Sequence, residues 1–562
     1  MKKTILSILA LVAGFATIQA QQVSVNIEPV GGEQNAMIRL EDGHKYLLLP
    51  IEEAAPESQV KLLVDAKIQE SFTAHLAQNH VDYYVPVELS AYKGHKIMVD
   101  ITDRSVVFAP QWKSLISLTN DYNTVNKEMW RPAFHHTPVY AWMNDPNGMF
   151  YDDTTNTWHL YYQWGPYGSM WNNMTWRHSS SKDLINWKDE GVAIKPNDLG
   201  TIFSGSCVVD KENTAGFGKG AIIALYTSAG ESQRQSLAYS TDGGKTFTNY
   251  VGNPVLSAGI PDFRDPNMFW NEKIGAWNLI LAAGQEMRIY SSPNLKDWKE
   301  ESRFGMGYGN HDGVWECPDL MPLKVLDKNG KETGKEKWVL VCNINPGGPW
   351  GGSATQYFVG DFDGHRFTCE DDAYDTKWMD YGKDHYATVS FSNAPNNRKV
   401  VLAWMSNWEY ANVVPTKQFR SANSIARDLF LYEVEGKSYV GCRPSPEYDN
   451  GVLNNILKGA DQTIKVNGSG SWNLSNSHGE QVTIDYDAKE GTLRVIRTKS
   501  GKTSFAPTFA ASTTAPVYRP LTSIRVICDN SSLEVFGNNG EVCLTNLVFP
   551  AEPLTKITVN KK

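Results

Sequence analysis

The 562-residue sequence is poor in three features: paired cysteines, long apolar runs and clusters of basic residues. Its seven cysteines are an odd number and contain no C-x-x-C pair, which argues against a zinc site and a disulfide scaffold, although one disulfide stays compatible with the count. The formal net charge is −9 without a basic run, so nucleic acid is not expected as a partner. Beyond the first 20 residues no stretch is long and apolar enough to span a bilayer.

The first 20 residues have the composition of a secretory signal peptide. Lys2 and Lys3 supply a positive start, an apolar stretch follows from Ile5 to about Ile18, and Ala20 is a small residue suited to cleavage. No cysteine lies near that point, so lipid attachment there has no support. We therefore expect an exported protein, periplasmic or extracellular, without a membrane span.

Changes in pattern divide the remaining chain into three parts, all predicted to be β-structure. Residues 21–125 hold short apolar runs between turn signals and predict a small accessory β domain, most simply a packing partner or spacer, alternatively a sugar-binding module. Residues 436–562 hold alternating runs separated by Gly and Asn turns, the pattern of a β-sandwich. The part between them, residues 126–433, repeats itself.

One apolar strand pattern occurs five times in this central part, at intervals of 63, 56, 61 and 61 residues. The copies are Trp158–Tyr162, Ala221–Leu225, Trp277–Leu281, Trp338–Cys342 and Lys399–Ala403. A second pattern follows four of them and is typical of a tight hairpin between the two outer strands of a sheet. Its copies are Ser180–Trp187, Tyr239–Phe247, Ser291–Trp298 and Asp361–Phe367. Repeats of this length with little helical periodicity indicate propeller blades, and five copies predict five blades.

Three acidic residues occur at similar places in this repeat. Asp145 lies in W-M-N-D-P-N-G, Asp265 in F-R-D-P-N-M-F-W and Glu316 in W-E-C-P-D-L, each near the start of the first strand of its repeat. The first strands of propeller blades line the central channel, so the three carboxylates are predicted to face one another around one pocket. Each motif alone is more simply a turn or a surface ion pair, and only the shared repeat position favours a site.

Carboxyl groups that face one another can divide the work of cleaving a sugar–sugar bond. One of them attacks and has to stay ionised, while another supplies a proton. An ionised carboxylate needs hydrogen-bond donors around it. For Asp145 the sequence offers Asn144 and the backbone amides of an expected turn at Pro146–Gly148.

The remaining two acids differ in their sequence neighbours. Glu316 stands between Trp315 and Cys317, and these apolar neighbours predict that it holds the proton. Asp265 follows Arg264, whose positive charge is predicted to keep the carboxylate ionised. A carboxylate that neither attacks nor donates can still bind hydroxyl groups and stabilise positive charge on the sugar.

Further motifs accompany the three acidic ones in a fixed order. They are F-S-G-S at 203–206, D-Y-G-K-D-H-Y-A-T-V-S-F at 380–391, F-R-S-A-N-S-I-A-R-D-L at 419–429 and S-L-E-V-F-G-N at 532–538. Together these motifs resemble the signatures of glycoside hydrolase family 32, the β-fructosidases such as invertase, inulinase and levanase. The resemblance covers about residues 128–560.

This resemblance implies an all-β fold, a five-bladed β-propeller followed by a β-sandwich, and a retaining double displacement without a metal or another cofactor. On the family pattern Asp145 is the nucleophile, Glu316 the acid/base and Asp265 the transition-state stabiliser. Other residues match positions that shape the pocket for the terminal fructosyl unit: Asn144, Gln163, Trp171, Phe203, Ser204 and Arg264. The implied substrates are fructans, fructo-oligosaccharides and sucrose-like fructosides.

The segment Asn345–Gln356 resembles that of exo-acting fructan hydrolases, and its glycines permit a compact loop that walls off one end of the channel. We therefore expect release of terminal fructose. The nearest alternatives are an endo-acting levanase and an enzyme that favours fructosyl transfer, and a fructan-binding protein without catalysis is an alternative of another class. Asn172 and Arg177 stand where the family usually has glycine, which leaves the preferred chain length and linkage open, as the oligomeric state is.

Overall fold

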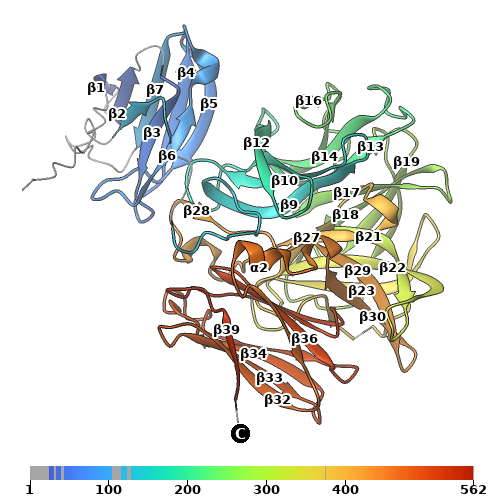
Figure 1. The fold of residues 1–562 in the computed structure, drawn as a ribbon. Helices are drawn as coiled ribbons and strands as arrows, with labels where there is room; N and C mark the ends of the chain where they lie inside the picture. Colours follow the sequence, from blue (N-terminus) through green and yellow to red (C-terminus); the bar gives the residue numbers. More distant parts are fainter. Residues whose placement is uncertain are drawn as a thin grey trace, which may run out of the picture. The chain divides into compact units, whose positions relative to one another are not determined.

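The computed structural model describes residues 24–30, 33–39, 44–103, 116–122, 128–373 and 375–560. The chain is mainly β-structure and divides into two compact units, residues 1–123 and 124–562. The first is a small β domain, and the second combines a propeller with a sandwich (Figure 1), so the predicted fold class is confirmed. The predicted signal peptide, residues 1–20, lies outside the described residues. Among the residues that are described, none belongs to a helix with the length and hydropathy of a membrane span.

The N-terminal unit contains two antiparallel sheets, with strand orders β1–β2–β7–β4–β5 and β6–β3–β8. Its strands are β1 (Ser24–Val30), β2 (Glu33–Arg39), β3 (Tyr46–Ile51), β4 (Ser58–Val64), β5 (Lys67–Ala74), β6 (Tyr83–Glu88), β7 (Ile97–Asp103) and β8 (Ser117–Thr119). In β4 every second residue is buried, among them Val60, Leu62 and Val64, which is the alternation that the sequence analysis uses. The sequence does not predict β5, because this edge strand is mostly exposed along its first half and reads as polar.

Five blades follow (Figure 1). In each blade the strands lie side by side in the order of the sequence, beginning with the innermost strand. Blade 1 holds β9 (Ala141–Asp152), β10 (Thr157–Gly165), β11 (Thr175–Ser181) and β12 (Trp187–Ile194). Blade 2 holds β13 (Thr201–Asp210), β14 (Ala221–Ala229), β15 (Gln233–Ser240) and β16 (Thr248–Asn249). Blade 3 holds β17 (Phe263–Asn271), β18 (Ala276–Ala283), β19 (Met287–Ser292) and β20 (Lys299–Phe304).

Blades 4 and 5 share one sheet, because β21 and β29 pair in parallel at Val325 and Leu431. Blade 4 holds β21 (Val314–Leu326), β22 (Glu332–Asn345), β23 (Ala354–Phe362), β24 (Phe367–Cys369) and the short β25 (Lys377–Trp378). Blade 5 holds β26 (Tyr386–Ser390), β27 (Val400–Trp404), β29 (Arg427–Val434) and β30 (Lys437–Pro444), while β28 (Phe419–Arg420) pairs with β9. Since β30 pairs with β29, the fifth blade continues past residue 433, where the sequence places the end of the propeller.

The five apolar repeats form the second strands of the blades, β10, β14, β18, β22 and β27. All residues of β10 are buried, as expected for a strand that neighbouring blades cover on both faces. The four predicted hairpins join the outer strands of blades 1 to 4. In each hairpin one Asp or Asn side chain accepts bonds from backbone N–H groups two to four residues ahead: Asp183, Asp242, Asn294 and Asp363.

Each innermost strand is interrupted by a β-bulge at the same level of the ring. The register with the second strand shifts at Asn144–Asp145, Phe203–Ser204, Asp265–Pro266, Cys317–Pro318 and Ala387–Thr388. A bulge leaves an extra residue without a ladder partner and re-aims its side chain. The propeller therefore carries a ring of five bulges around its axis.

Polar links between neighbouring innermost strands close this ring. Three acceptors receive backbone N–H bonds from the next blade, and one amide donates to a backbone oxygen. The pairs are Gly205 N to Asn147 (3.3 Å), Met268 N to Ser206 (2.9 Å), Asn267 to Pro318 O (3.1 Å) and Ser390 N to Asp319 (2.8 Å). Between blades 5 and 1 the backbone takes over, with Ser392 N donating to Met149 O at 2.9 Å. The interior strands are thus held in a closed circle.

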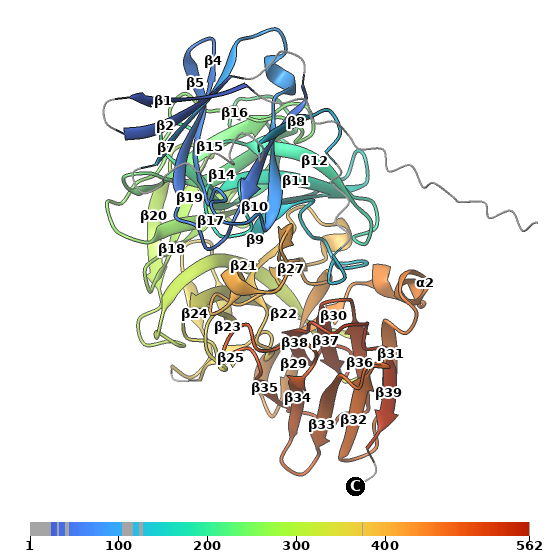
Figure 2. The same ribbon diagram turned by 90° about the vertical axis from the view of Figure 1, so that its left-hand side faces the viewer.

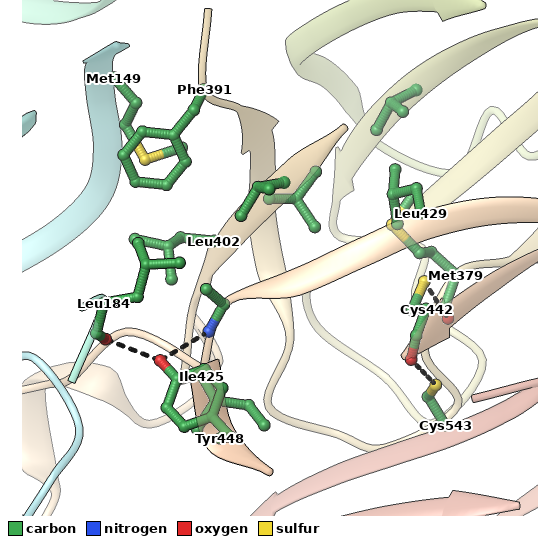
Figure 3. Close-up of a cluster of buried hydrophobic side chains, with 14 of the residues drawn as sticks. Met149, Leu184, Met379, Phe391, Leu402, Ile425, Leu429, Cys442, Tyr448 and Cys543 are labelled. Atoms are coloured by element: carbon green, nitrogen blue, oxygen red, sulfur yellow. Dashed lines mark hydrogen bonds between the residues drawn. The ribbon is translucent and has the colours of Figure 1, made fainter. Parts of the chain in front are cut away.

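An apolar cluster packs where blade 5 meets blade 1 (Figure 3). Figure 3 shows Met149 of β9 against Phe391, which follows β26. The hydroxyl of Tyr448 donates to Leu184 O at 2.7 Å and accepts from Ala426 N at 3.1 Å. This contact ties the segment after β30 to a hairpin of blade 1.

The C-terminal sandwich packs a four-stranded sheet, β31–β36–β37–β38, on a five-stranded sheet, β35–β34–β33–β32–β39 (Figure 2). A short helix, α2 (Val452–Ile456), precedes it. The strands are β31 (Asp461–Lys465), β32 (Gly470–Ser475), β33 (Gln481–Asp487), β34 (Thr492–Lys499), β35 (Ser512–Pro516), β36 (Ser523–Cys528), β37 (Ser532–Gly537), β38 (Val542–Leu547) and β39 (Lys556–Val559).

Buried charges, rather than apolar contacts alone, join the sandwich to the propeller. Arg427 of β29 donates to Asp380 at 2.8 Å and to Glu534 of β37. His135 lies between Asp529 and Glu534, with both ring nitrogens 2.7 Å from a carboxylate oxygen. All five side chains are at most 1% exposed, so the junction is a closed network of opposite charges.

Candidate active site

The three predicted acidic residues lie at the bulges of blades 1, 3 and 4. Glu316 is the last residue of β21 paired before its bulge, Asp265 is the first residue of its bulge and Asp145 is the second of its own. Their repeat positions therefore do not match: relative to the bulge, Asp265 lies one residue later than Glu316, and Asp145 lies one residue later than Asp265. Asp265 is 5% exposed, whereas Asp145 and Glu316 are partly buried.

The side chain of Cys317 lies between two of these carboxylates. Its Sγ is 3.5 Å from Oδ2 of Asp145 and 3.5 Å from Oδ2 of Asp265. Its backbone N–H donates to the same oxygen of Asp265 at 2.8 Å. Burial, followed by the surrounding carboxylates, raises the pKa of the Cys317 thiol, so it keeps its proton at neutral pH. The structure therefore brings Asp145 and Asp265 to the same thiol.

Asp145 receives its hydrogen bonds from side chains. Oγ of Ser204, from blade 2, donates to Oδ2 at 2.7 Å, and Oδ1 has no hydrogen-bond partner within the described part of the chain. Burial raises the pKa of Asp145, and hydrogen bonds from Ser204 and Asn144 act against this rise. The expected turn at Pro146–Gly148 is wrong, because these residues continue β9, where Pro146 and Asn147 pair with Tyr162 and Tyr161 of β10.

Arg264 pairs with Glu316 rather than with its sequence neighbour Asp265. Its Nη2 and Nε donate to Oε1 of Glu316 at 2.8 Å and 3.1 Å, and its Nη1 donates to Oδ1 of Asp262 at 2.5 Å. The positive charge of Arg264 acts on Asp265 in the expected direction, but burial outweighs it. Burial, helped by the charges of Glu316 and Asp145, raises the pKa of Asp265 to about 7, although Arg264 opposes the rise.

Glu316 has polar neighbours, which differs from the apolar surroundings expected from Trp315 and Cys317. Its Oε1 binds Arg264, and its Oε2 accepts a hydrogen bond from the hydroxyl of Tyr386. Trp315 is buried with its Nε1 bonded to a backbone oxygen 2.9 Å away. Burial raises the pKa of Tyr386 well above its usual value, so its phenol stays neutral. A neutral phenol can donate to a carboxylate or accept from a carboxylic acid.

Aromatic side chains form one wall beside the acids. Trp171 is 42% exposed and meets Phe203 edge-on, with ring centroids 6.0 Å apart. Trp408 lies 6.4 Å from Trp171 and stacks on Trp142 at 5.8 Å. Flat apolar faces with a polar edge suit sugar rings. Trp171 and Phe203 are predicted from the sequence, but Trp408 is not, since no motif around Trp408 links it to blade 1.

Two other predicted pocket residues, Asn144 and Gln163, lie at the bulge of blade 1 that carries Asp145. Oδ1 of Asn144 accepts from Nε1 of Trp142 at 2.8 Å. Gln163, on β10 opposite the bulge at Asn144–Asp145, is 2% exposed, and its Nε2 has no hydrogen-bond partner among the described residues. A small cavity is lined by residues of all five innermost strands, and Asp265 is the one of the three acids among them. Across the described ranges, no three His, Cys, Asp or Glu side chains are grouped to hold a metal ion.

Comparisons with protein families place these features in a known group. Residues 135–441 match the glycosyl hydrolases family 32 N-terminal domain, and residues 457–562 match the family 32 C-terminal domain. The chain belongs to glycoside hydrolase family 32. Residues 32–134 of this family-32 enzyme match a domain of unknown function.

Relatives with printed activities agree with this assignment. A levanase from Bacillus subtilis is 42% identical over 459 residues, covering 75% of this chain and 67% of the levanase. An extracellular exo-inulinase from Meyerozyma guilliermondii is 37% identical over 476 residues, covering 76% and 91% of the two chains. The family-32 protein is a glycoside hydrolase of the β-fructofuranosidase type.

Solved structures agree as well. The exo-inulinase from Aspergillus awamori superposes with a TM-score of 0.69 at 31% identity, covering 78% of this chain and 96% of that one. A fructofuranosidase variant from Schwanniomyces occidentalis complexed with fructosylnystose superposes with a TM-score of 0.67, also at 31% identity and with the same coverage. The family-32 fold assigned from the blade pattern is thus found independently by its three-dimensional similarity.

Proposed function

We propose that this enzyme releases terminal fructose from levan, inulin or sucrose-type fructosides by a retaining double displacement, outside the cytoplasm. The observation that supports it best is the arrangement around Cys317, where Asp145 and Asp265 contact one thiol and Glu316 lies in the same carboxylate cluster. Carboxyl groups arranged in this way can attack, protonate and stabilise charge at one anomeric carbon.

Asp145 is the proposed nucleophile. Ser204 holds one carboxylate oxygen, while Oδ1 has no hydrogen-bond partner among the residues that the structure describes and is suited to attack the anomeric carbon of a fructosyl unit. A carboxylate that is bound through only one oxygen keeps the other for bond formation. The attack forms a fructosyl–enzyme ester while the bond to the leaving oxygen breaks.

Glu316 is the proposed acid and base. It gives a proton to the leaving oxygen in the first step and takes one from water in the second, so its carboxyl group alternates between two states. The Tyr386 phenol suits both states, because it can donate to the carboxylate or accept from the acid. Arg264 holds the other oxygen and keeps the group aimed into the site.

Asp265 is the proposed stabiliser of the transition state. It lies too deep to be freely hydrated, and it accepts a backbone bond from Cys317 that holds its carboxylate in place. An ionised carboxylate at this place would accept bonds from sugar hydroxyls and oppose the positive charge that develops on the ring. Burial raises the pKa of Asp265 to about 7, and binding of a positively charged transition state would favour its ionised form.

A rigid loop in blade 4 supports exo rather than endo action. Nδ2 of Asn407 donates to Gly351 O at 3.2 Å, and Nζ of Lys383 donates to Trp350 O at 2.8 Å. Gly352 has a φ of 69°, and a Cβ there would lie 1.9 Å from Asn407, so only glycine fits. The loop also binds the aromatic wall, since Trp408 N donates to the hydroxyl of Ser353 at 3.3 Å.

The products formed from polymeric fructan test this proposal. Levan, inulin and sucrose are incubated with the enzyme, and the products are separated by size. Fructose as the only early product supports exo action, whereas a ladder of oligosaccharides would replace it with the endo-levanase alternative. Products longer than the substrate would indicate fructosyl transfer. Proton NMR of the first-formed fructose gives its anomeric configuration, and inversion would contradict the double displacement.

A fructan-binding protein without catalysis remains the alternative of another class. All three acidic residues are present, which favours an enzyme. The absence of any fructose release from all three substrates, together with binding of the polymers, would support the binding protein instead.

A further inference from the structure

One buried amide contacts two of the five bulges. Asn343 of β22 lies opposite Glu316 in the register and is 0% exposed. Its Nδ2 donates to Cys317 O at 2.7 Å and to Thr388 O at 3.4 Å. Its Oδ1 accepts from Thr388 N at 3.0 Å and from Oγ1 of Thr355 at 2.6 Å. The side chain therefore uses both donors and both acceptor positions of its amide.

These contacts satisfy backbone groups that the bulges leave without ladder partners. Cys317 is the first bulge residue of blade 4, and Thr388 is the second bulge residue of blade 5. The chain at both bulges is left-handed, with a φ of 41° at Cys317 and 54° at Ala387. Such backbone persists only where its surroundings hold it, and buried backbone groups need partners. The amide of Asn343 provides hydrogen-bond partners for these backbone groups and so holds the two bulges in place.

The two bulges carry a pair of interacting side chains. Glu316 immediately precedes Cys317, and Tyr386 immediately precedes Ala387. The contact between the Glu316 carboxylate and the Tyr386 hydroxyl bridges blades 4 and 5. Asn343 bridges the same blades one residue further along β21, at Cys317, and two residues further along β26, at Thr388. The distance between the acid and its phenol partner is thus set by the backbone segments that Asn343 joins.

We infer that Asn343 is a positioning residue that holds the carboxyl group of Glu316 against the Tyr386 hydroxyl for proton transfer to the leaving group. This inference rests on the proposed acid/base role of Glu316. Asn343 is 0% exposed and its amide is fully occupied by protein groups, so it acts through Glu316 rather than on the substrate. Its loss should slow protonation of the leaving group while the aromatic wall and Arg264 still bind the sugar.

The test compares Asn343→Ala on two substrates. Sucrose needs a proton on its leaving oxygen, whereas a nitrophenyl fructoside releases a stable phenolate without one. We expect kcat on sucrose to fall by roughly 10- to 100-fold, within the range that acid catalysis contributes, with KM nearly unchanged. On the nitrophenyl substrate kcat/KM should fall by less than about 3-fold, because it reports the first step alone and not the shared second step in which Glu316 acts as base. Equal losses on both substrates would overturn the inference.

Asn278 provides a matched control. It lies on β18, the corresponding second strand of blade 3, is 0% exposed, and its amide donates to Tyr290 O at 3.1 Å and to Gly364 O at 2.9 Å. Asn278→Ala removes a buried amide of the same kind away from the three acids. It should lower the melting temperature without distinguishing the two substrates. A substrate difference as large as that of Asn343→Ala would show that general loosening of the propeller explains the effect.

A double-mutant cycle tests the route through Tyr386. Because Asn343 is inferred to act on the Glu316–Tyr386 contact, adding Asn343→Ala to Tyr386→Phe should cost little further kcat on sucrose. Fully additive losses would contradict the inference. If Asn343→Ala does not fold, Thr355→Val removes one bond to Asn343 and should give the same substrate pattern at smaller size, with Thr355→Ser restoring activity. A normal kcat of Thr355→Val on sucrose would then overturn the inference.

Glu316→Gln separates this inference from the proposed function. If Glu316→Gln hydrolyses sucrose as fast as the wild type, the acid/base role itself fails. If Glu316→Gln loses sucrose hydrolysis but Asn343→Ala loses both substrates equally, only the positioning role fails.

Discussion

Two regions of the molecule bury charge in opposite ways. At the junction between propeller and sandwich, each buried carboxylate has a cationic partner, and Arg427 and His135 act against burial to lower the pKa of Glu534 to about 2. At the mouth of the propeller, Arg264 binds Glu316 and Asp262 but forms no hydrogen bond with Asp265, and burial raises the pKa of Asp265 to about 7. Burial alone therefore does not decide the direction of a pKa shift; the balance of neighbouring charge does.

This difference separates a structural site from a chemical one. His135 illustrates the structural case: burial would lower its pKa, but hydrogen bonds to Asp529 and Glu534 outweigh this and raise it to about 9. The imidazolium is thus satisfied by two carboxylates. In the propeller mouth the surplus of negative charge remains unbalanced, which is the state that a substrate with many hydroxyl groups and a positively charged transition state can relieve.

The largest expected effect is the loss of turnover when one of the surplus carboxylates is removed. Asp145→Asn keeps the shape and the hydrogen bond from Ser204 but removes the nucleophile. We expect kcat on sucrose to fall by roughly 1000-fold or more, while calorimetry still detects binding of a fructo-oligosaccharide. Asn407→Ser, which changes the residue that binds the blade 4 loop at Gly351, serves as the comparison, and a far smaller loss is expected. Unchanged turnover of Asp145→Asn would rule out its role as nucleophile.

Breaking the balance at the junction should instead destabilise the fold. Arg427→Leu leaves the buried carboxylates of Asp380 and Glu534 without their shared cation. We expect a loss of about 3–5 kcal/mol in the free energy of unfolding, measured by denaturant titration at pH 7. The folded fraction should retain its KM, because the junction does not line the site. A loss below about 1 kcal/mol would mean that water already compensates these charges.

Removing the charge of Asp265 from the propeller mouth should instead stabilise the fold. The pKa of Asp265 is raised from 3.8 to about 7 in the folded protein, so its contribution to stability is fully present below pH 4 and is lost as the pH rises through 7. Asp265→Asn should therefore raise the melting temperature at pH 8 and leave it almost unchanged at pH 4. The gain at pH 8 should be about 2–4 kcal/mol, while activity is lost. Equal shifts at both pH values would show that the buried charge is not the cause.

The smallest effect is expected at the rim. Trp171 is 42% exposed and contacts Phe203 and Trp408 only through ring edges. Trp171→Ala should raise KM for fructan by roughly 3- to 10-fold with little change in kcat, because it removes a platform for the sugar and no reacting group. Steady-state kinetics on inulin measures this, with Trp270→Ala, an exposed tryptophan on β17, as control. A large fall in kcat would assign Trp171 to the chemistry.

The sequence predicts the blades well because their signals are short. The apolar run Trp158–Tyr162 and the turn around Asp183 each lie within a few residues, and the structure forms a buried strand and an Asx turn there. Partners across blades have no such signal. The hydrogen bond of Ser204 to Asp145 spans 59 residues and that of Tyr386 to Glu316 spans 70, and no local pattern indicates either.

Arg264 is the most instructive case. Its place next to Asp265 suggests that its charge keeps this carboxylate ionised, but neighbours along a strand point to opposite faces. The bulge that begins at Asp265 and the closure of the ring bring Arg264 to Glu316 instead. Sequence adjacency is therefore a poor guide to ion pairs in a β-structure.

The amino-acid sequence by itself determined the β-class of the chain, the number of blades and which carboxylates belong to the first strands, because these depend on local patterning and on repeats. Only the tertiary structure decided which side chain faces which: the thiol of Cys317 between two acids, the phenol of Tyr386 on Glu316, and the amide of Asn343 across two bulges. The physical reason is that these contacts arise when the ring of blades closes, and closure joins residues that the chain itself keeps far apart.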